Sequence, residues 1–105
     1  MPDGAAASRS EPQAEGGTSP WCVYIVRCAD GTLYTGIARD VQARTQAHNA
    51  GRGARYTRTR RPVELVHWEP AIDRSQALRR EHEIRRRGSA YKRALAIRGM
   101  HVGPE

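Results

Sequence analysis

The apolar residues of the chain fall into short segments, and their spacing changes from one segment to the next. Residues 21–27 (WCVYIVR) are apolar at almost every position, which is typical of a central strand covered on both faces. Residues 33–37 form a second short strand, and the Ala-Asp-Gly segment at 29–31 is typical of a hairpin turn. Residues 63–68 (VELVHW) alternate as a third strand does.

Three further segments are typical of helices. Asp40 is a good N-cap for a helix that runs to about Ala50. Residues 73–76 (DRSQ) resemble a capping box, which predicts a second helix over residues 73–87. A last short helix is predicted over residues 89–98, with four side chains facing inward: Tyr91, Ala94, Leu95 and Ile97.

The two ends of the chain differ from the part between them. Residues 1–20 contain no Leu, Ile, Val, Phe, Tyr or Trp and are expected to form a disordered tail. A folded domain over residues 21–98 and a C-terminal tail over residues 99–105 follow. No segment has the apolar core of a secretory signal or the length of a membrane span.

Charge is distributed unevenly along the chain. The formal net charge is +7, and residues 1–20 contribute −2 (three acidic residues against one arginine), so the remainder carries +9. A small domain with this charge favours a polyanionic partner, most often nucleic acid. The alternative is a general preference for arginine, because Lys92 is the only lysine.

The two cysteines lie on or beside the first strand. Cys22 and Cys28 are six residues apart, which in a strand is roughly 20 Å and too far for a mutual disulfide. The spacing does not match a C-x-x-C metal pair either. Both are expected to be reduced core thiols in a cytoplasmic protein.

The length of the hairpin loop decides which side chains share a face of the sheet. A two-residue Asp30-Gly31 loop places Tyr24 and Tyr34 on opposite faces. A three-residue loop that also includes Ala29, with Gly31 left-handed, places both tyrosines on one face. Local turn statistics favour the two-residue loop.

Charged residues on the predicted helices supply the candidate chemistry. Arg44 and His48 share one stripe of the first helix, beside a narrow stripe formed by Ala43, Ala47 and Ala50. Glu81 lies in the middle of the apolar face of the second helix, and a buried carboxylate is costly unless it is paired, protonated or bound to metal. An ion pair with Arg44 or a neighbouring arginine is as good an interpretation of Glu81 as a metal site.

A long basic loop separates the first helix from the third strand. Its apolar content is too low for a core element, so it is expected to bind phosphates, with an aromatic ring available to stack on a base. The alternative is a loop that only improves solubility. The candidate nucleic-acid-binding residues are Arg52, Arg55, Tyr56, Arg58, Arg60 and Arg61.

Taken together, these segments resemble the GIY-YIG nuclease superfamily, and most closely its small single-domain bacterial members. The first motif is present as residues 22–24 (CVY) and the second as residues 34–36 (YTG). The helix motif over residues 36–48, a basic loop over residues 51–58 and the helical segment 77–81 (ALRRE) follow in order.

The resemblance covers residues 21–88 and implies an α+β fold of the order β-β-α-β-α-α, with a three-stranded antiparallel sheet flanked by helices. In this fold both tyrosines face one site, which selects the three-residue loop. Cys22 stands where the motif has Gly and Thr35 where it has Ile. Neither departure removes a charged group.

The resemblance also implies metal-dependent cleavage of a phosphodiester bond. Glu81 would hold one divalent cation, Mg²⁺ or Mn²⁺. Tyr24 or Tyr34 would orient or deprotonate the attacking water with help from His48, and Arg44 would stabilise the charge that grows in the transition state. His67 and His82 show no pattern of partners and are assigned to the structure or the surface.

The predicted function is therefore an endonuclease acting on DNA, with branched or single-stranded forms as candidate substrates and DNA repair as the setting. RNA is the second candidate substrate, and a protein partner is open. The alternative is a non-catalytic nucleic-acid-binding module on a nuclease fold. A binding module needs no carboxylate on an apolar helix face, which favours the enzyme.

Overall fold

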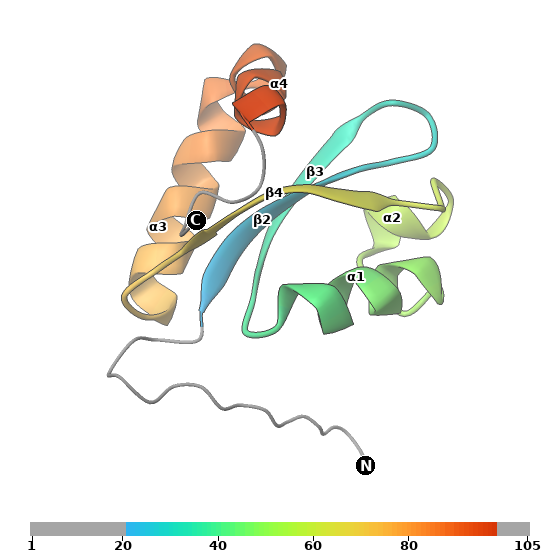
Figure 1. Ribbon diagram of the computed structural model, residues 1–105, viewed down its shortest axis with the longest axis horizontal. Helices are drawn as coiled ribbons and strands as arrows, with labels where there is room; N and C mark the ends of the chain where they lie inside the picture. The colour runs from blue at the N-terminus through green and yellow to red at the C-terminus, as the bar shows by residue number, and fades with distance from the viewer. Residues whose placement is uncertain (1–20, 99–105) are drawn as a thin grey trace.

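The structure, a computed structural model, describes residues 21–98 and contains a three-stranded antiparallel sheet with helices on both faces (Figure 1). The strands lie in the order β3-β2-β4, and the helices pack as α1 and α2 on one face and α3 and α4 on the other. The predicted tails over residues 1–20 and 99–105 lie outside the described residues. The elements are β2 (Cys22–Arg27), β3 (Leu33–Ala38), α1 (Val41–Asn49), α2 (Arg55–Arg58), β4 (Glu64–Pro70), α3 (Arg74–Arg87) and α4 (Ser89–Arg98).

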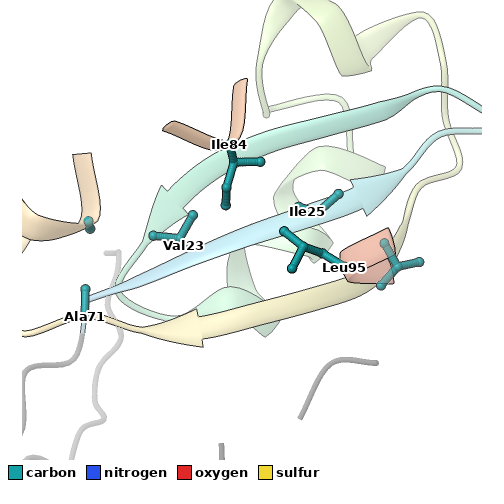
Figure 2. Close-up of a cluster of buried hydrophobic side chains, with 7 residues drawn as sticks. Val23, Ile25, Ala71, Ile84 and Leu95 are labelled. Carbon is teal, nitrogen blue, oxygen red and sulfur yellow. The ribbon is translucent and has the colours of Figure 1, made fainter. Parts of the chain in front are cut away.

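The central position of β2 explains why this strand is apolar on both faces. Val23 and Ile25 pack against Ile84 of α3 and Leu95 of α4 (Figure 2). Tyr24 points to the opposite face and belongs to a second core cluster near α1. The α+β fold and the central strand predicted from the sequence are confirmed.

The hairpin between β2 and β3 has a three-residue loop. The main-chain N–H of Cys28 donates to the carbonyl of Thr32 at 2.8 Å, and Gly31 has a φ of +89°. The resulting register places Tyr24 and Tyr34 on one face of the sheet. Local turn statistics therefore gave the wrong loop length, because a left-handed glycine allows the longer turn.

The helices begin where the sequence predicts. The Asp40 carboxylate accepts a hydrogen bond from the N–H of Ala43 at 3.0 Å, and the Asp73 carboxylate accepts one from the N–H of Gln76 at 2.8 Å. The third strand starts one residue later than predicted and ends two residues later, at Pro70. Among the described residues, no helix has the length and apolar character needed to cross a membrane.

The predicted inward face of α4 is wrong in part, and on α1 the fully buried residue is His48, whereas Ala43 is exposed. On α4, Leu95 is buried, but Ala94 is exposed and Ile97 is 84% exposed. Tyr91 and Ala96 pack against the core beside Leu95, so the inward face of α4 is formed by residues 91, 95 and 96.

Candidate active site

A chain of hydrogen bonds buried beside the sheet joins Tyr24, His48 and Thr57. The Tyr24 hydroxyl lies 2.8 Å from His48 Nε2, and His48 Nδ1 lies 2.7 Å from Thr57 Oγ1. The Thr57 hydroxyl donates its only proton to the carbonyl of Ala54 at 2.9 Å. It must therefore accept from Nδ1–H, which assigns neutral His48 a bare Nε2 that accepts the Tyr24 proton.

The partner that fixes His48 comes from the basic loop. The prediction that this loop holds no core element is wrong, because the short helix α2 turns Thr57 inward until it is fully buried. Gly53 of the same loop lies so close to His48 that a Cβ there has no room. The imidazole is thus clamped between α1 and a loop that the sequence alone suggests is solvated.

Burial and charge keep this chain in its neutral form. Burial and the nearby Arg44 guanidinium lower the pKa of His48. Burial raises the pKa of the Tyr24 phenol, an effect that Arg44 opposes and that Tyr34 and Glu81 reinforce. These mutual effects show that the five predicted catalytic residues gather in one place.

Glu81 reaches this cluster from α3. Its side chain is 17% exposed, and its ion pair with Arg85 is long, at 3.3 Å, with a partner that is itself 63% exposed. The ion pair predicted as one interpretation of Glu81 exists, with Arg85 rather than Arg44. It leaves the carboxylate with an oxygen for which no hydrogen bond is seen among residues 21–98.

The residues around Glu81 fit a divalent cation with few protein ligands. Within residues 21–98, no group of three or more His, Cys, Asp or Glu side chains is placed to enclose a metal ion. Mg²⁺ commonly binds through one or two carboxylates and keeps several waters. Glu81, half-buried and weakly paired, matches that requirement.

A column of aromatic and charged groups covers the other side of His48. The ring of Tyr34 meets the His48 ring edge-on, with centroids 5.6 Å apart, and stacks on Tyr56 at 5.9 Å. The Arg60 guanidinium lies 3.9 Å from the centroid of the Tyr56 ring. Tyr56 therefore supports Tyr34 and contacts Arg60 while it stays 37% exposed.

The arginines of the basic loop divide into two groups. Arg60 pairs with Asp30 at 3.1 Å, and Arg61 donates to two main-chain carbonyls, so these two brace the loop. No bonds are seen for the other three side chains within residues 21–98, and all three are exposed: Arg52, Arg55 and Arg58.

A second polar cluster, on the other side of the sheet, was missed by the sequence analysis. The Nε and Nη2 atoms of Arg80 on α3 donate to the two carboxylate oxygens of Glu69 at 2.8 and 2.9 Å. His67, predicted to be structural, is buried and lies 2.8 Å from the same carboxylate. Burial favours a high pKa for Glu69, but the bonds from His67 and Arg80 lower it to about 2.

Comparison with known proteins identifies the family of this domain. The family model of the GIY-YIG catalytic domain matches residues 20–93. UPF0213 proteins from Staphylococcus aureus strains MW2 and COL are each 59% identical over 63 residues, which is 60% of this chain and 77% of the relative.

One solved structure also matches. The solution NMR structure of a UPF0213 protein from Bacillus halodurans is 37% identical, with a TM-score of 0.49, and the match covers 80% of this chain and 87% of that one. The family match spans most of the chain and includes every residue of the cluster described above. The chain belongs to the GIY-YIG catalytic domain family and carries a domain of the nuclease type.

Proposed function

We propose that the chain is a metal-dependent endonuclease that hydrolyses phosphodiester bonds in DNA, with single-stranded or branched DNA as its substrate. The observation that carries this proposal is the buried Tyr24–His48–Thr57 chain beside Arg44 and Glu81. Binding alone needs no neutral histidine with a fixed tautomer. Hydrolysis needs a group that accepts a proton from water near neutral pH.

Tyr24 and His48 form the path for that proton. The Tyr24 oxygen accepts a proton from the attacking water while its own proton passes to His48 Nε2. His48 then becomes an imidazolium that donates from both nitrogens, one to Tyr24 and one to Thr57. Tyr34, which is only half-buried, lies beside this pair and orients the water or the phosphate.

Arg44 and Glu81 supply the two charged groups that the reaction needs. The Arg44 guanidinium stabilises the phosphate oxygens as their charge increases in the transition state. Glu81 would hold Mg²⁺ or Mn²⁺, and the bound cation supplies a Lewis acid for the phosphate oxygens. The exposed arginines of the basic loop bind the backbone on either side.

A cleavage assay tests the proposal. Labelled single-stranded, duplex, flap and four-way DNA, and single-stranded RNA, are incubated with Mg²⁺ or Mn²⁺ and the native chain, Glu81→Gln or Glu83→Gln. Glu83 is the matched control, because it lies on the same helix but pairs with Arg80 and Arg87. We expect metal-dependent cuts from the native chain and the control, and at least about a 100-fold loss in Glu81→Gln.

Three outcomes contradict the proposal in whole or in part. Normal cleavage by Glu81→Gln removes the metal assignment. Binding of the oligonucleotides without cleavage by any of the three proteins identifies a nucleic-acid-binding module in place of an enzyme, and preferred cleavage of RNA corrects the substrate.

A further inference from the structure

A cleft of about 560 Å³ lies along the free edge of β3, next to the candidate active site. The hairpin and β3 form one wall, and the end of α3 with the start of α4 forms the other. Figure 1 shows α4 above this edge of the sheet. The volume is typical of pockets that hold a small molecule, so the cleft has room for a nucleotide as well as for an ion.

The charge of this cleft is positive. Arg85, Lys92 and Arg93 line it, and no acidic side chain of the described residues does. Lys92 is half-buried, and its ammonium lies 3.4 Å from the carbonyl of Leu33 at the strand edge. Burial and the neighbouring Arg85 lower the pKa of Lys92. An anion in the cleft relieves this repulsion between cations.

Thr35, at the base of the cleft, has an unsatisfied hydroxyl. The residue is 2% exposed, and its Oγ1 has no hydrogen-bond partner among residues 21–98. An unmet buried polar group costs about 1–3 kcal/mol. Because the neighbouring pair Cys28–Thr32 is hydrogen-bonded, the alternation also turns the main-chain groups of Thr35 toward the free edge.

Two residues connect the cleft to the active site. Tyr34 lines the cleft and also contacts the ring of His48. Arg85 lines the cleft and pairs with Glu81. The cleft therefore begins where the catalytic cluster ends, so a strand whose phosphate lies beside Glu81 continues into it.

We propose that this cleft binds the backbone phosphates of the nucleic-acid strand immediately next to the bond that is cut, through Lys92, Arg93, Arg85 and the Thr35 hydroxyl. This inference rests on the proposed function for the position of the cut, and assigns to α4 and the free edge of β3 a part in holding the substrate. It differs from the exposed arginines of the basic loop, none of which lines the cleft, although Tyr56 of that loop does.

Binding of a fluorescein-labelled single-stranded oligodeoxynucleotide, measured by anisotropy in EDTA so that cleavage is excluded, tests the cleft. The variant Lys92→Ala/Arg93→Ala is compared with Arg86→Ala/Arg98→Ala, which removes two exposed arginines of the same two helices outside the cleft. We expect the cleft variant to bind at least about 10-fold more weakly, with a salt slope reduced by about 1.4. The control should change less than about 3-fold.

Thr35→Val separates binding from folding. Removal of an unpartnered buried hydroxyl should leave thermal stability equal or higher, while affinity for the oligonucleotide falls about 3-fold. Equal losses in the cleft variant and the control, or native affinity in Thr35→Val and the cleft variant, would overturn the inference.

Parallel cleavage reactions separate this inference from the proposed function. Binding through the cleft without cuts by the native chain rejects the nuclease and keeps the cleft. Cuts by the native chain, with the cleft variant behaving like the control, reject the cleft and keep the nuclease.

Discussion

Glu69 of β4 and Glu81 of α3 belong to two different polar clusters, and each side chain is 17% exposed. Glu69 is held by the two-pronged grip of Arg80 and by His67, at 2.8 to 2.9 Å. Glu81 has one long contact with an exposed arginine. The two side chains are equally exposed but unequally paired, and this difference in pairing is why we propose a metal-binding role for Glu81 and a structural role for Glu69.

The two buried histidines differ in the same way. His67 contacts the carboxylate of Glu69, which is already fixed by Arg80. His48 accepts from a phenol and donates to a threonine, so its Nε2 is a neutral base next to a proton donor. The cluster around His67 suits a structural role, and the cluster around His48 suits the proton transfer that we propose.

The largest expected effect is the difference in cleavage rate between His48→Gln and His67→Gln. His48→Gln should reduce cleavage by about 100-fold or more, because general acid–base catalysis contributes about 10²–10⁴. His67→Gln should keep near-native cleavage at temperatures where circular dichroism shows it folded. Single-turnover cleavage of the preferred DNA measures both rates, and equal losses would remove the distinction between the two clusters.

Substitution of the two carboxylates should change the free energy of unfolding by different amounts. Glu69→Gln should lower the free energy of unfolding by about 2 to 3 kcal/mol, because a charged hydrogen-bonded pair is broken. Glu81→Gln should change it by less than about 1 kcal/mol, because its partner is exposed. Urea unfolding at pH 7 measures both, and a larger loss in Glu81→Gln would mean that Glu81 is the structural carboxylate.

The shifted pKa values of Glu69 and His48 predict how the free energy of unfolding depends on pH. The pKa of Glu69 falls from 4.5 to about 2 on folding, so its contribution is full above pH 4.5 and is lost as the pH falls toward 2. The pKa of His48 is also lowered, so the unfolded chain takes up a proton first and stability falls as the pH drops below 6.5. Glu69→Gln should abolish the lower step and keep the upper one.

The smallest effect concerns the two groups of loop arginines. Arg55→Ala/Arg58→Ala should weaken DNA binding and reduce the salt slope by about 1.4 to 1.8, without loss of stability, since both side chains are exposed. Arg60→Ala/Arg61→Ala should also lower stability, because bonds to Asp30 and to the main chain are lost. Anisotropy at several salt concentrations measures the binding, and thermal melts measure the stability. An unchanged salt slope in Arg55→Ala/Arg58→Ala would mean that the loop contributes only to solubility.

The fold could be predicted because its signals are local. The apolar run at residues 21–27, the N-caps Asp40 and Asp73, and the Ala-Asp-Gly turn each fix one element. The loop length could not be obtained from turn statistics, because two lengths suit the same residues. The requirement that both tyrosines share a face was needed to select it.

The parts that could not be predicted depend on contacts between distant segments. Thr57 reaches His48 only because α2 forms inside a loop with almost no apolar residues. The Arg80 side chain turns toward the sheet because Glu69 of β4 accepts its hydrogen bond. In the structure, Gly53 lies against His48. The glycine alone was a weak signal of this contact, because a glycine in a basic loop has many explanations.

The threonine that orients His48 lies between Tyr56 and Arg58, within the segment proposed to touch the nucleic-acid backbone. In the proposed function, contact with the nucleic-acid strand and proton transfer therefore share a single turn of helix. A strand that displaces α2 would change the geometry of the hydrogen bond that orients His48. The proposed binding residues and the proposed base are thus coupled through neighbouring positions in the chain.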